Sequence, residues 1–184
     1  MLDVKKLLYA ATLLIFAVAA GCSGIPKYTD GEVPFVPTPP EVIDRMFEIA
    51  RVGKDDLLYD LGSGDGRIVI AAARRFGIRA VGIEIDPELV EKARSAAFRE
   101  KVHELVDFRR QDALTVDVSR ATVVTLYMLP DFNARLRSIF DKQLKPGARV
   151  VSHDFPIEGW TPDRVQTIKG DLLHDHTIYL FEVH

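Results

Sequence analysis

A glycine-rich segment between an apolar strand and a helix restricts most strongly what this 184-residue chain can fold into. The segment spans residues 59–67 and reads Tyr-Asp-Leu-Gly-Ser-Gly-Asp-Gly-Arg, directly after the apolar residues Leu57 and Leu58. Glycines in such a turn adopt positive φ angles and let a ligand approach the backbone closely. A strand, a glycine turn and a helix in this order begin a βαβ unit, which predicts a parallel sheet.

The rest of the chain alternates between helix and strand patterns in the same way. Apolar residues recur at helical spacing, between proline and glycine boundaries, over residues 41–51, 67–76, 87–102 and 131–143. Short apolar or β-branched runs predict strands over residues 56–60, 79–85, 106–110, 121–127 and 148–152. Two late strands, 164–169 and 177–183, have no helix between them, so they should pair as an antiparallel hairpin. The prediction is an α/β fold, a Rossmann-like, doubly wound and mostly parallel seven-stranded sheet with a C-terminal antiparallel hairpin.

The glycine segment distinguishes between two kinds of cofactor. A dinucleotide fingerprint needs a third glycine at position 67, which is arginine in this chain. The pattern present is Asp-x-Gly-x-Gly-x-Gly, the first motif of enzymes that use S-adenosylmethionine (SAM). Asp60 can accept a hydrogen bond from the ammonium group of SAM, whereas a pyrophosphate beside Asp60 and Asp65 would be repelled. The cofactor-binding residues predicted from this motif are Asp60, Gly62, Ser63, Gly64, Asp65 and Gly66.

Two further acids follow the next two predicted strands. Glu84 lies about 20 residues past the glycines, where an acid binds the ribose hydroxyls of a nucleoside. Ile85 can then pack on the face of the adenine. Asp112 is expected to accept a hydrogen bond from the adenine amino group, with the backbone N–H of Ala113 meeting a ring nitrogen. A solvated strand end for Glu84 and a plain turn residue for Asp112 remain the alternatives.

With these residues in place, the chain resembles the class I SAM-dependent methyltransferases. The run from Asp60 to Val69 is similar to the protein-lysine methyltransferase family that acts on the ATP synthase c-subunit and the adenine nucleotide translocase. The resemblance covers about residues 34–160, and it implies methyl transfer from SAM to an amine acceptor. It also suggests that residues 36–38 fold over the cofactor, with Thr38 near its carboxylate. From the residues alone, Thr38 is equally a cap for the helix that follows the two prolines at 39–40.

Three candidate catalytic residues end or follow the fourth and fifth predicted strands, at the same edge of the sheet as the glycine segment. Tyr127 is the candidate for lining the acceptor site, with a core aromatic as the alternative. His153 and Asp154 are candidates for orienting the substrate, with a loop histidine beside a capping aspartate as the alternative. Methyl transfer is a direct displacement at a sulfonium, so alignment and exclusion of water matter more than a dedicated base. A lysine acceptor must arrive uncharged, and a dry site lowers its pKa.

What the sequence lacks narrows the acceptor further. The strand ending at Tyr127 is not followed by the Asn/Asp-Pro-Pro-aromatic motif of adenine N6 and amide methylases. Cytosine C5 methylation needs a cysteine nucleophile, and the only cysteine, Cys22, lies in the leader. A net charge of −3 predicts no nucleic-acid partner, and one cysteine with five scattered histidines predicts no metal. The expected acceptor is a protein lysine, with a small-molecule or lipid acceptor, or a non-catalytic SAM-binding lipoprotein, as alternatives.

Residues 1–22 have the pattern of an export signal. Lys5 and Lys6 precede the uncharged residues 7–20, a stretch too short to span a bilayer comfortably. Residues 19–22, Ala-Ala-Gly-Cys, resemble the lipobox of bacterial lipoproteins, which predicts lipidation of Cys22. A plain signal peptide or an uncleaved anchor is the alternative.

The following residues, 23–40, are rich in glycine and proline and predict an extended tether. Residues 41–184 are then the methyltransferase domain, held at the membrane of a bacterial cell envelope. The two leader lysines place the domain outside, whereas SAM is made in the cytosol, so the side of the membrane stays open.

Overall fold

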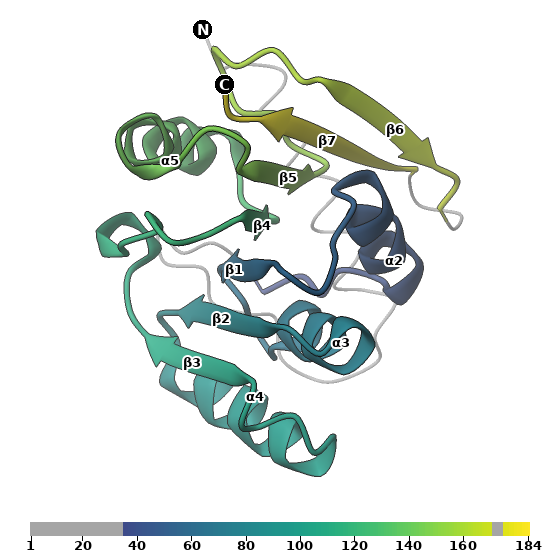
Figure 1. Ribbon diagram of the computed structural model, residues 1–184, viewed down its shortest axis with the longest axis vertical. Helices are drawn as coiled ribbons and strands as arrows, with labels where there is room; N and C mark the ends of the chain where they lie inside the picture. The colour runs from purple at the N-terminus through teal and green to yellow at the C-terminus, as the bar shows by residue number, and fades with distance from the viewer. Residues whose placement is uncertain (1–34, 171–174) are drawn as a thin grey trace, which may run out of the picture.

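Seven strands form one sheet in the order β3-β2-β1-β4-β5-β7-β6 in the computed structural model, which describes residues 35–170 and 175–184 (Figure 1). The first five strands are parallel: β1 (Leu57–Leu61), β2 (Arg79–Glu84), β3 (Val106–Arg110), β4 (Val123–Leu126) and β5 (Arg149–His153). β7 (His176–Glu182) runs antiparallel between β5 and the edge strand β6 (Arg164–Ile168). The predicted seven-stranded sheet with a C-terminal antiparallel pair is therefore confirmed.

The helices begin and end close to the prolines and glycines that the sequence analysis used as boundaries. Three of them begin at a proline, whose fixed φ angle suits the first helical turn: α2 (Pro40–Ile49), α4 (Pro87–Arg99) and α5 (Pro130–Gln143). α3 (Arg67–Phe76) ends at Gly77, which takes a left-handed φ of 67°. α4 ends three residues before the predicted boundary, and a short 3-10 turn, η1 (Ala113–Thr115), was not predicted.

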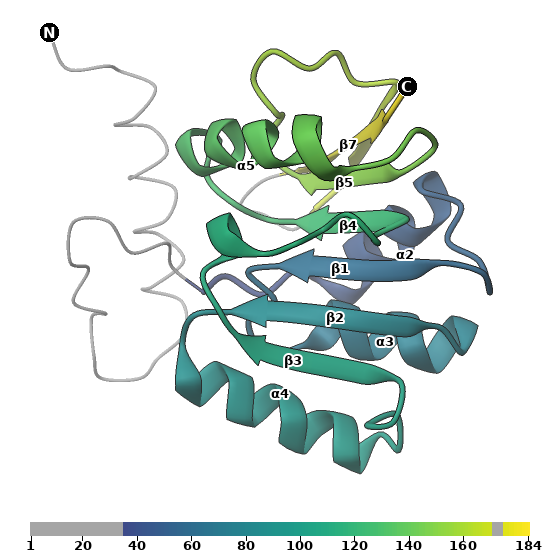
Figure 2. The same cartoon turned by 60° about the vertical axis from the view of Figure 1, so that its left-hand side comes forward.

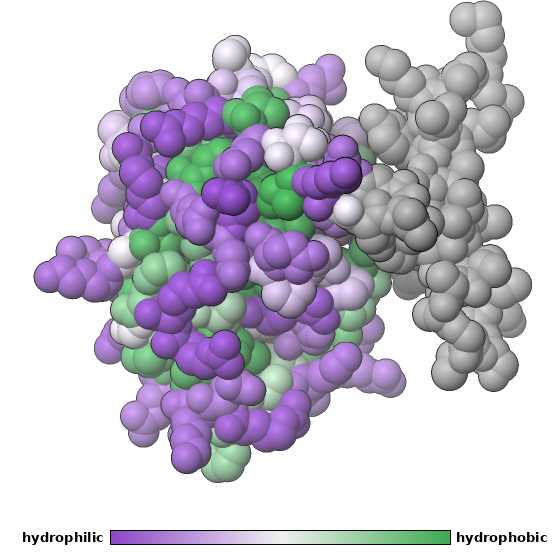
Figure 3. Space-filling view, turned by 90° about the vertical axis from the view of Figure 1, so that its right-hand side faces the viewer, coloured by the Kyte–Doolittle hydropathy of each residue, from purple (hydrophilic) through white to green (hydrophobic). Residues whose placement is uncertain are grey.

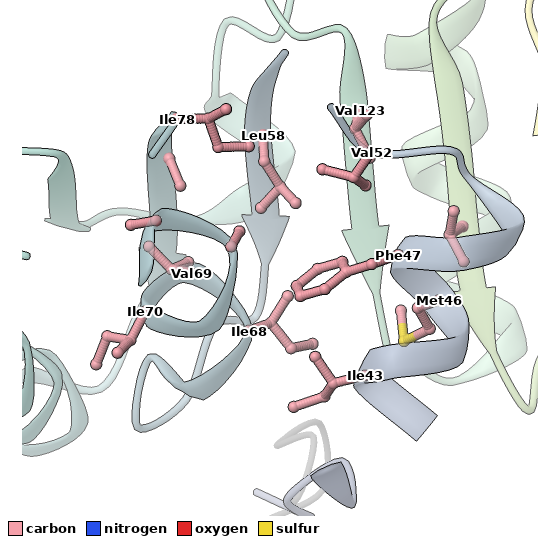
Figure 4. Packing of buried hydrophobic residues seen from close by; sticks show 14 of the residues in the cluster. Ile43, Met46, Phe47, Val52, Leu58, Ile68, Val69, Ile70, Ile78 and Val123 are labelled. Carbon is pink, nitrogen blue, oxygen red and sulfur yellow. The ribbon is translucent and has the colours of Figure 1, made fainter. Parts of the chain in front are cut away.

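Each face of the sheet has its own hydrophobic core. On one face, α2, α3 and α4 pack against the strands, and Figure 4 shows Phe47 of α2 and Ile68 of α3 meeting beside Leu58 of β1. On the other face, Leu136 and Phe140 of α5 are fully buried against the sheet. Burying side chains of this size contributes about 1.5–3 kcal/mol each. The two cores hold the strand ends rigidly, and the site depends on those ends.

The sheet brings the carboxyl ends of the parallel strands to one edge (Figure 2). β1 lies between β2 and β4, so the order of the strands reverses at β1. In register, Asp60 of β1 pairs with Gly82 on one side and Thr125 on the other. Ligands of doubly wound sheets bind at such a reversal, outside the carboxyl ends of the strands.

The outer surface around α2 and β6 is mostly hydrophilic, with small separate groups of hydrophobic residues (Figure 3). Exposed ion pairs join α2 to itself and to α3, as between Arg45 and Glu48 at 2.6 Å and between Arg75 and Asp44 at 2.7 Å. Within residues 35–170 and 175–184, no helix combines the length and the apolar character needed to cross a bilayer. The predicted leader with Cys22 lies outside the described residues.

Candidate active site

A cavity of about 890 Å³ opens at the carboxyl edge of the sheet. Its volume is in the range of sites for small molecules and cofactors. Nine of the residues predicted to bind the cofactor line it, namely Thr38, Asp60, Gly62, Ser63, Asp65, Glu84, Ile85, Asp112 and Ala113. Gly64 and Gly66 belong to the same turn but are not among the lining residues. The fold therefore collects at one site residues that lie far apart in the sequence.

Glu84 lies at the centre of this arrangement, at the end of β2. One of its carboxylate oxygens, Oε2, accepts a hydrogen bond from the backbone N–H of Gly64 at 2.8 Å. The other, Oε1, accepts from the N–H groups of Ile85 and Asp86 at 2.8 and 3.0 Å. In a dinucleotide fold, the N–H groups of the glycine turn face a pyrophosphate. In this chain, a carboxylate of the protein itself holds that N–H of Gly64, which disfavours an anionic ligand.

Asp60 is buried, with 3% of its surface exposed, and it lines the same cavity. Burial raises the pKa of its carboxyl from 3.8 to about 7, and repulsion from Glu84 and Asp65 adds to the rise. A hydrogen bond from Thr125 Oγ1 at 2.7 Å acts in the opposite direction. Because a nearby positive charge would favour the ionised carboxyl, the cavity suits a cationic ligand. SAM, with its sulfonium and ammonium groups, fits this requirement, and a pyrophosphate does not.

Arg67 ties the glycine turn to the segment before α2. Its guanidinium donates two hydrogen bonds to Asp65, at 2.9 and 2.8 Å, and one to the backbone oxygen of Thr38 at 3.1 Å. Burial acts to raise the pKa of Asp65, but the hydrogen bonds and charge of Arg67 outweigh it and lower that pKa. The bidentate pair therefore keeps Asp65 ionised beside the cavity and holds residues 35–38 along its wall.

Thr38 does not cap α2, so that alternative is wrong. Pro39 is the residue before the helix, and no side chain caps the first turn. The hydroxyl of Thr38 instead lies 3.4 Å from Nδ1 of His153, inside the protein. This position, with Thr38 lining the cavity, agrees with the suggestion that residues 36–38 fold over the site.

Phe35 is a cavity residue that the sequence did not reveal. A Cβ atom on Gly64 would lie 2.2 Å from Cε2 of the Phe35 ring, so only glycine permits this approach. Gly64 also has a φ of 53°, which L side chains disfavour. The aromatic ring therefore covers the glycine turn from the tether side. The sequence signal for a role of Phe35 is its aromatic side chain within a proline-rich run.

Asp112 caps a short turn and also lines the cavity. Its Oδ1 accepts a hydrogen bond from the N–H of Leu114 at 2.9 Å, so it caps η1, and it also lines the cavity. Ala113, the first residue of η1, is buried beside it. Ile85 is 65% exposed at the cavity, an unusual position for a large apolar residue, and this suits packing on a flat ring.

Tyr127 lines the cavity, so it is not simply a core aromatic, and it connects the cavity to a buried polar group behind it. Its hydroxyl donates to Oδ2 of Asp154 at 3.1 Å, and its ring lies 3.9 Å from the His153 ring at an angle of 35°. Burial raises the pKa of Tyr127, and the charge of Asp154 adds to the rise, so the phenol is neutral at physiological pH. Tyr127 is therefore suited to form a wall of the site, and it is unsuited to act as a base.

The two other predicted catalytic residues lie behind this wall. His153 is fully buried, and neither His153 nor Asp154 lines the cavity. They contact two residues that line the cavity, Tyr127 and Thr38, so their position supports a role in holding those residues more than direct contact with substrate. His176, which the sequence did not single out, lies 3.0 Å from His153, from Nδ1 to Nε2. The two histidines are 23 residues apart in the sequence, so local spacing does not predict their contact.

Comparison with known proteins decides the family. Residues 60–164 match the family model described as the ANTKMT methyltransferase domain. The chain belongs to this family. Among the relatives of this ANTKMT-family chain is a protein-lysine N-methyltransferase from Saccharolobus islandicus. It is 44% identical over 82% of this chain and 94% of its own length.

Two further relatives extend the comparison of this ANTKMT-family chain. The human lysine N-methyltransferase of the ATP synthase c-subunit is 39% identical over 72% of this chain, which spans 56% of that protein's length. A crystal structure of an RNA methyltransferase from Salinibacter ruber with S-adenosyl-L-homocysteine is 55% identical, with a TM-score of 0.75. It covers 80% of this chain and 94% of its own. The predicted fold, cofactor and enzyme class are thereby confirmed: the protein is a SAM-dependent methyltransferase.

Proposed function

We propose that this methyltransferase transfers the methyl group of SAM to the side-chain amine of a protein lysine. The observation that carries the proposal is a single cavity lined by the carboxyl groups of Asp60, Asp65 and Glu84 and by the uncharged phenol of Tyr127. The names of the Saccharolobus and human relatives, both lysine methyltransferases, support the choice of acceptor.

The chain's own residues divide the binding of the cofactor between them. We assign Asp60 to the ammonium group of SAM, because a buried carboxyl regains its charge beside a cation. Glu84 is assigned to the ribose hydroxyls and Asp112, with Ala113, to the adenine, since all three line the cavity along successive strand ends. Ile85 is assigned to the face of the adenine ring.

On the acceptor side, the wall is mainly apolar or aromatic. Tyr127, Met128 and Phe132 line this part of the cavity, and such a wall excludes water from the reacting groups. The bound cofactor supplies a methyl group on a positively charged sulfur. A lysine that has given its proton to solvent would accept this methyl group and leave S-adenosyl-L-homocysteine, and these side chains would hold the uncharged amine in the site. Desolvation of the lysine against these side chains favours its neutral form.

The alternatives differ in the acceptor. A small molecule or lipid would use the same cavity, and the Salinibacter relative is described as an RNA methyltransferase. A net charge of −3 favours a protein acceptor over RNA, because binding to the phosphate backbone depends on basic residues.

The test uses the full chain, SAM with a labelled methyl group, and an extract of the native host. Label in a protein fraction that resists ribonuclease and disappears with protease, with methyl-lysine found by mass spectrometry, is the expected result. The Asp60→Ala variant is the control for cofactor-dependent transfer. Label that disappears with ribonuclease, or that extracts with lipids or small molecules, would replace the lysine proposal with the corresponding acceptor. A wild-type chain that binds SAM but labels nothing would favour the non-catalytic alternative.

A further inference from the structure

Three potential metal ligands meet behind the Tyr127 wall, although they are separated in the sequence. β5 ends at His153, and β7 begins at His176, with His153 opposite Ile178 in the antiparallel register. Asp154 follows His153 directly and has a left-handed φ of 58°, which a non-glycine residue disfavours. Its Oδ1 accepts a hydrogen bond from the N–H of Thr177 at 2.8 Å. The turn therefore points the other carboxylate oxygen, Oδ2, toward the two imidazoles.

The three ligand atoms have the spacing of a coordination sphere. Nε2 of His153 lies 3.0 Å from Nδ1 of His176 and 3.3 Å from Oδ2 of Asp154. Nδ1 of His176 lies 3.7 Å from that same oxygen. Ligands at about 2.0–2.2 Å from a zinc ion, in tetrahedral or octahedral geometry, lie roughly 3–3.6 Å from one another. We propose that His153, Asp154 and His176 bind one divalent transition-metal ion of the zinc class.

The type of ligand and its burial favour a transition metal. Two imidazole nitrogens suit zinc, nickel or copper, whereas magnesium and calcium prefer oxygen ligands throughout. His153 is fully buried and His176 is 8% exposed, so both rings are fixed by packing before an ion arrives. The carboxylate of Asp154 offsets part of the charge that an ion would bring into this interior.

Hydrogen bonds can hold the same atoms when no ion is bound. At 3.0 Å, the nitrogens of His153 and His176 share one proton, and a metal must displace it. Binding therefore forms bonds from the three ligand atoms to the ion, and the displaced proton moves to the other nitrogen of its neutral imidazole, Nδ1 of His153 or Nε2 of His176. Among the described residues, Tyr127 is a neighbouring titratable group: it donates to Oδ2 of Asp154 at 3.1 Å and stacks on His153.

Such an ion would have a structural role in the site. It would link the carboxyl end of β5 to the start of β7, directly behind Tyr127. Because Tyr127 contacts two of the three ligands, fixing them fixes the acceptor wall. The inference concerns only these side chains and does not depend on the identity of the methyl acceptor.

The test measures metal binding without any activity. The full chain, purified without a histidine tag and stripped with a chelator, is titrated with Zn²⁺ by calorimetry and with Co²⁺ by visible absorption. One ion per chain and a rise in melting temperature with Zn²⁺ are expected. His176→Ala and Asp154→Asn should weaken binding at least about tenfold and abolish the rise in melting temperature.

His184→Ala is the matched control. His184 is exposed and lies 3.6 Å from Asp163, so it is a histidine–carboxylate pair without a second imidazole. Its loss should leave Zn²⁺ binding unchanged. The proposal is overturned if the wild type binds no stoichiometric ion, if His184→Ala abolishes binding, or if Asp154→Asn, with circular dichroism showing a folded protein, binds as the wild type does. The cluster is then a hydrogen-bonded histidine pair only. SAM binding measured on the same samples tests the proposed function separately.

Discussion

The carboxylate of Glu84 holds the backbone N–H of Gly64, with 2.8 Å between Oε2 and the nitrogen. This contact places a negative charge of the protein at the turn where dinucleotide enzymes place the negative charge of their ligand. We therefore expect the chain to bind SAM and S-adenosyl-L-homocysteine and to show no binding of NAD. Calorimetry with the three ligands measures this directly. Binding of NAD without binding of SAM would contradict the assignment of the cavity.

Glu84→Ala should weaken SAM binding by roughly 1.5–3 kcal/mol, the range for hydrogen bonds to a charged group. The substitution removes the proposed acceptor for the ribose hydroxyls and releases the N–H of Gly64. Glu91→Ala is the control, because Glu91 is exposed on α4, pairs with Arg94 and does not line the cavity. Equal affinities for SAM in both variants would show that Glu84 is an ordinary residue at a strand end.

Gly64→Val should reduce SAM affinity at least about tenfold, equal to 1.4 kcal/mol, with the fold retained. The new side chain would displace the Phe35 ring, which lies where a Cβ atom would have to be. Gly77→Val is the control, since Gly77 has a similar φ of 67° but a Cβ atom there would meet nothing within 4 Å. Both variants place valine at a positive φ and so carry similar backbone strain, but only Gly64→Val should lose affinity for SAM. Calorimetry and circular dichroism on both separate the two effects.

Asp60→Asn should have opposite effects on stability and on SAM binding. The pKa of Asp60 is raised to about 7 in the folded protein, so its contribution to stability is full below about pH 4 and is lost as the pH rises through 7. From pH 4 to pH 8, the free energy of unfolding of the wild type should fall relative to that of the asparagine variant, which has no titrating group at this position. The expected difference is on the order of 4 kcal/mol. Denaturant unfolding at the two pH values measures this difference.

The same substitution should weaken SAM binding, because asparagine offers no negative charge to the ammonium group. In the wild type, SAM favours the ionised carboxyl, so affinity should rise with pH through about 7. Calorimetry at several pH values follows this rise. A flat pH profile in the wild type would remove Asp60 from the cofactor's ammonium group.

Cys22→Ser tests the proposed anchor of the chain. The wild type, expressed in its native host, should be found in the membrane fraction and should begin at Cys22 with added lipid mass. The serine variant should lose both properties. Intact mass spectrometry and fractionation measure them. Wild-type protein that retains residues 1–21 without lipid would instead make residues 7–20 an uncleaved anchor.

The parts of the site that follow a strand in the sequence could be predicted from the sequence. Asp60, Glu84 and Asp112 each follow or end a parallel strand, and the rule that such ends share one edge brought them together correctly. The glycine turn could be predicted from the spacing of Asp60 and the three glycines that follow it. These features are local, or depend on a topology that the helix–strand alternation already implies.

Contacts that depend on side-chain packing could not be predicted in this way. Phe35 covers Gly64 because of the path of a proline-rich segment, and that path has no periodic pattern. His176 meets His153 because β7 inserts beside β5 in one particular register. The histidines are scattered in the sequence, and the antiparallel pairing of two strands alone brings them to 3.0 Å.

Phe35 and Thr38, near the end of the predicted tether, form part of the cavity wall. Phe35 lies thirteen positions after Cys22. Fully extended, that length of chain spans at most about 45 Å. If Cys22 is lipidated as predicted, this length of chain would keep the catalytic cavity within about 45 Å of the bilayer. Acceptors would then be selected by their height above the lipid, in addition to the fit of their lysine.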